Sequence, residues 1–448
     1  MTQSLDTLTK ALLRAAEKAG ADSADAMAAR GSSISVDVRG GKLEQAERSE
    51  GVDIGLRVFI GKRSANVSAS DTSDNTIEEM AVRAIAMAKE APEDPYSGLA
   101  DPDQLATQWD VESLELCDPS PEPTPETLQD DAARAEAASL AIKGVTQVQS
   151  ASAGYGAQRV FLAATNGFEG GYRRTDRGLS CVAIAGAGSG MERDYDGDSR
   201  VFQADLRSAE DIGKSAGTRA LAHLDARKPP TGTFPVLFDE RISSTLIGHL
   251  LAAINGAAIG RGASWLRDAM DQQVLPAGVY LIEDPHRPRT PGSRPFDAEG
   301  LPTSKRVIVE DGILKSWTLD LAAARKLGLP PTANAARGPG SNPSPATWNI
   351  ALAQGEASRE GLIKDMGTGL LVTSMIGSTI NPNTGDYSRG ASGLWVENGE
   401  VTHAINECTI AGNLRDMLAN FLAANDARQH LSRVVPSLLV PGMTLAGT

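Results

Sequence analysis

Gly51-Val52-Asp53-Ile54-Gly55-Leu56-Arg57-Val58 is followed by a turn at Gly61-Lys62 and then by Ser64-Ala65-Asn66-Val67-Ser68-Ala69. In both runs, apolar residues alternate with polar or small ones. This is the period of a β-strand that buries one face. Two such runs joined by a short turn containing glycine predict an antiparallel hairpin.

Helical patterns and further strands surround this hairpin. Leucines recur at helical spacing from residue 5 to about residue 19, where Gly20 ends the first predicted helix. The pattern predicts an N-terminal α/β domain that contains antiparallel strands and helices. Further helices are predicted at 77–91, 127–142 and 208–224, and further strands at 34–38, 145–155, 159–165, 168–175 and 179–187.

A domain boundary is predicted in the polar, Pro- and Gly-rich segment Arg227-Lys228-Pro229-Pro230-Thr231-Gly232. We therefore divide the chain into an N-terminal domain, 1–228, and a C-terminal β-rich domain, 229–448. The second domain is expected to be barrel-like or a twisted antiparallel sheet, which makes the fold class α+β. Its predicted strands are 234–238, 279–283, 307–310, 313–319, 348–353, 369–375, 393–397, 400–403 and 409–411, with helices at 240–254 and 414–423.

Composition excludes several functional classes. The 448-residue chain has a net charge of −14, which disfavours a nucleic-acid-binding surface. It contains no apolar segment long enough to cross a membrane and no apolar core of a signal peptide. Its three cysteines, Cys117, Cys181 and Cys408, form no CxxC pair, which is typical of a reducing compartment. We expect a cytoplasmic protein.

The predicted helix at 240–254 contains Ser244-Thr245-Leu246-Ile247-Gly248-His249. A zinc peptidase helix carries two histidine ligands and a glutamate base beside the first. Ser244 and Thr245 occupy the positions of the first ligand and the base, and neither can perform those roles. A lone His249 among apolar residues is typical of a packed, hydrogen-bonded core histidine, and Ser243 and Ser244 are expected to cap the helix.

A second group of polar residues lies in the turn-forming segment 381–390. Such a loop could line a cleft and donate hydrogen bonds to a peptide, although a plain surface loop would have the same composition. Cys408 alternates like a buried strand residue, and we expect it to pack as a small hydrophobe. The residues proposed to contact a peptide are Asn381, Asn383, Asp386, Tyr387, Ser388 and Arg389.

The chain resembles the PmbA/TldE branch of the TldD/PmbA peptidase family, also called modulators of DNA gyrase. The likeness covers nearly the whole chain, and its specificity comes from the order of many short matches. These matches are 51–58, 94–96, 164–168, 191–196, 246–250, 297–303, 309–314, 385–390 and 409–414.

In the TldD branch of this family, a HExxxH helix binds zinc with a further cysteine ligand. In this chain the motif corresponds to residues 244–249, and only its second histidine is present, as His249. The glycine-rich setting of the family's cysteine is missing around Cys408, so that role is not carried over. The resemblance implies a metal-free subunit with no metal ligands and no catalytic residues of its own, and zinc is expected only in a TldD-like partner.

Such a heterodimer would degrade unfolded peptides and process peptide precursors. Two alternatives remain open. The first is a peptide-binding or scaffold protein that acts alone, as a homodimer. The second is an independent hydrolase that combines His249 with a nucleophile and uses no metal.

Overall fold

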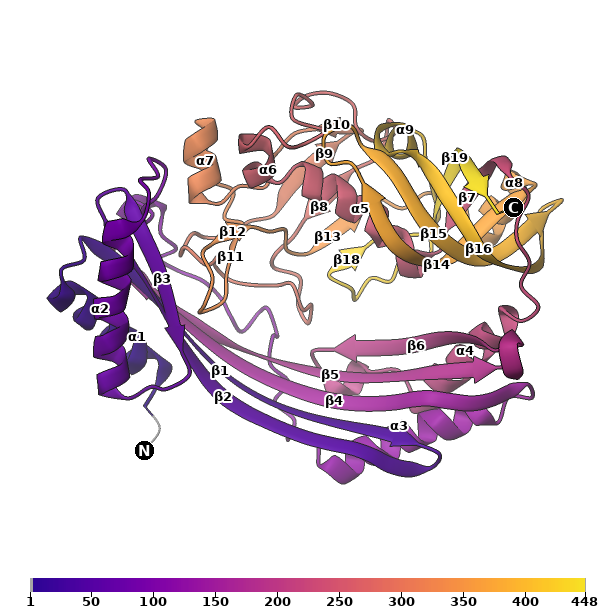
Figure 1. Cartoon of the computed structure of the whole chain (residues 1–448), viewed down its shortest axis with the longest axis horizontal. Coiled ribbons are helices and arrows are strands. Elements are labelled where there is room, and N and C mark those ends of the chain that lie inside the picture. The colour runs from indigo at the N-terminus through magenta and orange to yellow at the C-terminus, as the bar shows by residue number, and fades with distance from the viewer. Residues whose placement is uncertain (1–2, 448) are drawn as a thin grey trace.

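The computed structural model describes residues 3–447. Its N-terminal part is built on a six-stranded antiparallel sheet in the order β3-β2-β1-β4-β5-β6. The sheet is strongly curved and has the shape of half a barrel, with a concave and a convex face (Figure 1). Its strands are β1 (Ser23–Arg39), β2 (Lys42–Ile60), β3 (Arg63–Ala69), β4 (Val145–Ala164), β5 (Glu169–Ala185) and β6 (Glu192–Arg200).

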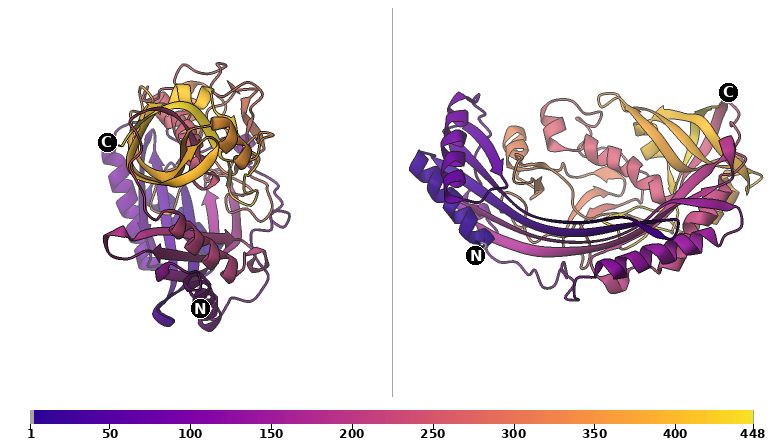
Figure 2. Two further views of the ribbon diagram at one scale, coloured as in Figure 1. Left: turned by 90° about the vertical axis from the view of Figure 1, so that its right-hand side faces the viewer. Right: turned by 60° about the horizontal axis from the view of Figure 1, so that its bottom comes forward.

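Four helices cover the two ends of the convex face (Figure 2). One pair packs on Ala28 and Ile54, and the other packs on Ile34 and Val36. The centre of the convex face, around Arg30 on β1, lies between the two pairs. The helices of the first pair are α1 (Leu5–Ala19) and α2 (Asp74–Glu90), and those of the second are α3 (Pro125–Leu140) and α4 (Ala209–Ala222).

The predicted hairpin is confirmed, since Ile54 to Ile60 of β2 pair with Arg63 to Ala69 of β3. The predicted first helix is also confirmed, and Gly20 ends it with a left-handed conformation (φ 96°).

Two long strands, β4 and β5, were each predicted wrongly as two shorter strands. The predicted strands 145–155 and 159–165 are the single strand β4, and 168–175 and 179–187 are the single strand β5. Gly156 pairs with Asp176 and Gly154 with Gly178, so the ladder continues through the residues between the predicted strands. Non-local pairing with two neighbouring strands outweighs the weak local preference of glycine.

The C-terminal region contains a closed five-stranded barrel, as the β-rich prediction expected. The row β16-β15-β14-β7-β19 closes because β16 also pairs with β19. The short strand β17 (Leu422–Ala423) pairs with β19. The barrel strands are β7 (Gly232–Phe238), β14 (Gly369–Ile380), β15 (Asp386–Glu397), β16 (Glu400–Asn413) and β19 (Leu438–Ala446).

Helices pack on both faces of the barrel strands. Val236 and Phe238 of β7 belong to a cluster with residues of α5 (Glu240–Ala253) and α9 (Leu414–Ala419). The intervening Leu237 packs against α8 (Arg359–Met366). This alternation places α5 directly against the strands that carry the segment 381–390.

A smaller sheet, in the order β10-β9-β8-β13-β18, lies between the barrel and the first helix pair (Figure 1). The short helices α6 and α7 and the two-stranded sheet β11–β12 accompany it. Their bounds are β8 (Leu281–Glu283), β9 (Arg306–Glu310), β10 (Ile313–Leu314), β11 (Ala335–Ala336), β12 (Ser344–Pro345), β13 (Ile350–Leu352), β18 (Arg433–Val434), α6 (Gly256–Gly260) and α7 (Leu321–Leu327).

The concave face of the N-terminal sheet turns toward this C-terminal region (Figure 1). Asp25 on β1 forms ion pairs with Arg57 on the neighbouring β2 and with Arg337, which follows β11. All three side chains are less than a tenth exposed. At Gly55, a Cβ atom would lie 2.0 Å from the carbonyl oxygen of Pro339, so only glycine allows this close approach.

None of the helices within residues 3–447 combines the length and the apolar character that crossing a lipid bilayer requires.

Candidate functional site

Helix α5 carries residues 244–249, the segment that corresponds to a zinc-peptidase motif. Its N-cap is Asp239, whose side chain accepts a hydrogen bond from the backbone of Arg241. The prediction that Ser243 and Ser244 cap the helix is therefore wrong. The Ser243 hydroxyl instead donates to backbone carbonyls, including that of Val435 at 3.4 Å, and the Thr245 hydroxyl donates to a carbonyl one turn back at 2.7 Å.

His249 projects from the last part of α5 toward strand β15. Its imidazole makes an edge-to-face contact with the Tyr387 ring, with the ring centroids 5.8 Å apart. Its Nε2 atom is buried and has no hydrogen-bond partner within residues 3–447. His249 is thus half-buried and packed against Tyr387, but its Nε2 atom does not form a hydrogen bond of the kind expected for a core histidine.

The surroundings of His249 favour the neutral imidazole. Burial lowers the pKa of His249 to about 4, and the positive charge of Arg389 contributes in the same direction. A ring with this pKa is uncharged at neutral pH. It can neither pair with a carboxylate nor deliver a proton there as an acid.

The segment proposed to contact peptides forms the connection between β14 and β15. Asn381 accepts a hydrogen bond from the backbone of Asn383 at 3.0 Å through its side-chain oxygen. The Thr384 hydroxyl donates to the Asp386 carboxylate at 2.6 Å, and the Asn413 amide donates to the same carboxylate at 3.1 Å. These polar side chains hold the turn in shape, and those of Asn383 and Asp386 remain exposed.

The next three residues enter strand β15. Tyr387 is buried, donates a hydrogen bond to the Met375 sulfur at 3.3 Å, and has its pKa raised to about 12, mainly by burial. Ser388 and Arg389 are half-buried, and the Arg389 guanidinium donates to the Gly377 carbonyl at 2.7 Å. Of the six predicted contact residues, Tyr387 and Arg389 are therefore the two that the fold brings beside His249.

Cys408 lies on the adjacent strand β16, directly opposite Ala391. Its sulfur is 3.1 Å from the Ala391 carbonyl oxygen, and burial raises the pKa of the thiol to about 11. A protonated, buried thiol is a poor nucleophile and a poor metal ligand. This environment agrees with the predicted packing role.

The residues around His249 do not fit a catalytic zinc ion. Such an ion requires three protein ligands and an open position. Ser244 and Thr245 provide neither an imidazole nor a carboxylate. Within residues 3–447, no three histidine, cysteine, aspartate or glutamate side chains are grouped closely enough to hold a metal ion. The positive charge of Arg389 would also oppose a cation at the imidazole.

The contact between His249 and Tyr387 joins residues of two predicted groups that the sequence analysis treated separately. No local pattern connects a helix residue with a strand residue that far along the chain. The signal that was available is alternation: Tyr387, Arg389 and Ala391 share one face of β15. That face is the one that α5 covers.

Three family models match the chain in succession. Domain 1 of the PmbA/TldA metallopeptidases matches residues 24–88, the central domain matches 118–224, and the C-terminal domain matches 231–447. The matches thus include both the curved sheet and the barrel.

Curated relatives agree over nearly the whole length. The metalloprotease PmbA of Escherichia coli O157:H7 is 37% identical over 95% of this chain and 92% of its own. A PmbA homologue from Haemophilus influenzae is 34% identical over 96% of this chain and 94% of its own.

Solved structures share the fold. A structure described as a modulator of DNA gyrase from Bacteroides thetaiotaomicron superposes with a TM-score of 0.92 at 25% identity and covers 100% of both chains. TldE from Thermococcus kodakarensis superposes with a TM-score of 0.85 at 20% identity, over 98% of this chain and 100% of its own. At that level of identity, the second likeness is one of fold alone.

Proposed function

The chain belongs to the PmbA/TldD metallopeptidase family, and we propose that within this family it is a metal-free, non-catalytic subunit of a TldD/TldE-type peptidase complex. The observation that carries the proposal is the environment of His249. His249 is the one position of the compared motif that holds a histidine, while Ser244 and Thr245 hold the other two positions. The positive charge of Arg389 acts on the His249 imidazole.

Hydrolysis also requires a general base or an activated nucleophile, and α5 supplies neither. A general base must accept a proton from water, and the hydroxyl of Thr245 is itself used as a donor to a backbone carbonyl. A non-metal nucleophile would need an acceptor such as His249 within hydrogen-bond reach. The buried Nε2 of His249 has no partner of this kind in the described part of the chain.

The partner in this proposal is a TldD-like chain with an intact HExxxH helix, and the substrates are unfolded peptides and peptide precursors. The concave sheet and the C-terminal region would then form part of a chamber that encloses the peptide. We keep the exposed turn residues Asn383 and Asp386 as proposed peptide contacts. Asn381, Tyr387, Ser388 and Arg389 complete this proposed set.

We also retain two further elements as proposals. The chain would act in the cytoplasm, where its three unpaired cysteines would stay reduced. It would divide into the regions 1–228 and 229–448, a division that falls in the gap between the central and C-terminal family models at 224 and 231.

The experiment is reconstitution with purified proteins. The chain alone should contain no stoichiometric zinc by elemental mass spectrometry and should leave unfolded casein intact. Adding a TldD-like chain should produce cleavage, and a partner whose HExxxH glutamate is replaced by glutamine should not. One tightly bound zinc ion per isolated chain would overturn the proposal.

His249→Ala serves as the matched variant. Under the proposal, the reconstituted complex keeps its cleavage rate, because His249 packs against Tyr387 and touches no substrate. Loss of cleavage in a variant that still folds and still binds the partner would instead make His249 catalytic. Size-exclusion chromatography separates a third outcome, in which the chain forms homodimers and ignores the TldD-like protein.

A further inference from the structure

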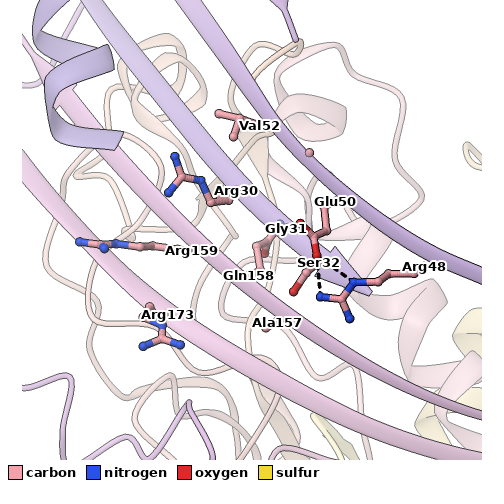
Figure 3. Close-up of a pocket in the computed structure, with 11 residues that line it drawn as sticks. Arg30, Gly31, Ser32, Arg48, Glu50, Val52, Ala157, Gln158, Arg159 and Arg173 are labelled. Atoms are coloured by element: carbon pink, nitrogen blue, oxygen red, sulfur yellow. Dashed lines mark hydrogen bonds and ion pairs between the residues drawn. The ribbon is translucent and has the colours of Figure 1, made fainter. Parts of the chain in front are cut away.

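The convex face of the N-terminal sheet carries a groove of about 520 Å³ between the two helix pairs. Arg30 on β1 is the direct cross-strand neighbour of Arg159 on β4, and Arg159 is the neighbour of Arg173 on β5. Directly paired residues project from the same face of a sheet. The three arginines therefore form one row across three adjacent strands (Figure 3).

This arginine row, Arg30, Arg159 and Arg173, is poorly neutralised. Arg30 donates a hydrogen bond to the carbonyl of Gln3 at 2.9 Å. Within residues 3–447, the side chains of Arg159 and Arg173 make no hydrogen bond and no ion pair, and both are exposed. Like charges directly opposite each other destabilise a sheet, so the row has an energetic cost that no side chain of the described structure offsets.

Glu50, which lines the groove, and Glu122, which precedes α3, are both paired with a fourth arginine. Arg48 on β2 pairs with Glu50 of the same strand and with Glu122 before α3, each at 2.5 Å. Glu50 and Glu122 are thereby held by Arg48. The groove keeps its positive charge although the whole chain carries a net charge of −14.

Two helices begin at the edges of the groove. Gln3, whose carbonyl contacts Arg30, directly precedes the N-cap Ser4 of α1. Glu122, which contacts Arg48, lies two residues before the N-cap Thr124 of α3. Helix N-termini carry a partial positive charge, and these two add to the field of the arginine row.

We propose that this groove binds a compact phosphate oligoanion, either free di- or triphosphate or the phosphate chain of a nucleotide. Neighbouring strands are about 4.8 Å apart, so the row spans about 10 Å at its base. Three guanidinium forks can donate to about six oxygens within this span. A single carboxylate has two such oxygens, whereas a diphosphate or triphosphate has enough for all three forks.

The shape of the floor agrees with such a ligand. Ser32 and Ala157, the next cross-strand pair on the convex face, have small side chains. Because these neighbouring side chains are small, they leave space in which the three arginine side chains can contact one ligand. The Ser32 hydroxyl is available as an additional donor.

This site is separate from the surroundings of His249. The groove lies on the convex face, whereas the concave face meets the C-terminal region that contains α5 (Figure 1). The proposal does not depend on the role of the chain in a peptidase complex. Its outcome can be read from the isolated chain by binding and unfolding measurements.

The test is calorimetric titration of the full chain with inorganic triphosphate at constant ionic strength, together with thermal unfolding. We expect one site per chain and a rise in the unfolding temperature, because the ligand binds only the folded sheet. Arg159→Gln and Arg173→Gln should each weaken binding by about 10-fold or more, and the double variant should abolish it. Arg83→Gln, on the exposed face of α2, is the matched control and should bind like the unmodified chain.

Several outcomes would overturn the proposal: no heat of binding, equal weakening by Arg83→Gln, or unchanged binding by the double variant. Citrate or an oligoglutamate peptide binding more tightly than triphosphate would also overturn it, because the ligand would then be a carboxylate. Parallel titrations with ATP and ADP distinguish a nucleotide ligand from free di- or triphosphate. A nucleotide that binds at least as tightly as triphosphate assigns the site to nucleotides, and a weaker one assigns it to free polyphosphate.

Discussion

The two faces of the N-terminal sheet hold arginines in opposite electrostatic situations. On the concave face, Arg57 and Arg337 share the carboxylate of Asp25, and all three side chains are nearly inaccessible to solvent. On the convex face, Arg159 and Arg173 stand exposed and without a carboxylate partner in the described structure. Arg57, Arg159 and Arg173 belong to this sheet, whereas Arg337 comes from the C-terminal region.

The difference follows from what covers each face. The C-terminal region covers the concave face around Asp25, and a buried guanidinium without a carboxylate would be very costly there. The centre of the convex face is left bare between the helix pairs. Water screens the repulsion within the arginine row there, so the cost stays small enough to be retained. Arg57 and Arg337 are therefore structural, whereas Arg159 and Arg173 are available to a ligand.

The largest effect should come from removing the carboxylate of the concave cluster. Asp25→Asn leaves two buried guanidinium groups sharing no negative charge, and we expect a loss of about 3 to 5 kcal/mol in the free energy of unfolding. Urea denaturation measures it. The exposed Asp53→Asn on β2 is the control and should cost less than about 1 kcal/mol.

A double variant sharpens this test. Asp25→Asn combined with Arg337→Met removes one of the two unpaired charges and should recover part of the loss. If Asp25→Asn alone costs no more than the Asp53 control, the concave cluster does not join the sheet to the C-terminal region, and the comparison between the two faces fails.

A smaller, pH-dependent effect should come from Glu299, beside the concave cluster. Burial, together with the charge of Asp297, raises the pKa of the Glu299 carboxyl above its ordinary value of 4.5. Above that pH, the folded chain holds a proton that the unfolded chain has released. The contribution of Glu299 to stability is therefore complete below about pH 4.5 and is lost as the pH rises.

Glu299→Gln should accordingly match the unmodified chain at pH 4 and be more stable at pH 8, by about 1 to 2 kcal/mol. The hydrogen bond that Glu299 accepts from the backbone of Leu321 can be kept by glutamine. Denaturation curves at the two pH values measure the difference, with the exposed Glu310→Gln as control. A variant less stable at pH 8 than the unmodified chain would show that the carboxylate there is ionised and well paired.

The smallest effect on stability should come from removing arginines of the convex face in the absence of a ligand. Arg159→Gln combined with Arg173→Gln removes the repulsion within the row and should stabilise the chain by about 0.2 to 1 kcal/mol at low salt. The gain should disappear at high salt, because these charges are exposed. A destabilised double variant at low salt would mean that the arginines pack or pair in a way that contradicts the contrast between the two faces.

The sequence by itself determined much of the local structure. Alternating apolar residues gave the hairpin of β2 and β3, and leucine spacing with Gly20 gave α1. The absence of an imidazole and a carboxylate at Ser244 and Thr245 is also a property of sequence alone. Each of these conclusions depends on residues a few positions apart, whose interactions are fixed by helix and strand geometry.

Only the tertiary structure decided which distant segments of the chain lie beside each other. The last strand, β19, was not predicted, and its pairing with β16 closes the barrel. The contact of His249 with Tyr387 and the alignment of Arg30, Arg159 and Arg173 depend on packing and on register between distant segments. A shift of one residue in that register would turn a side chain to the opposite face. The register is set by the summed pairing and burial of whole strands, which no local pattern contains.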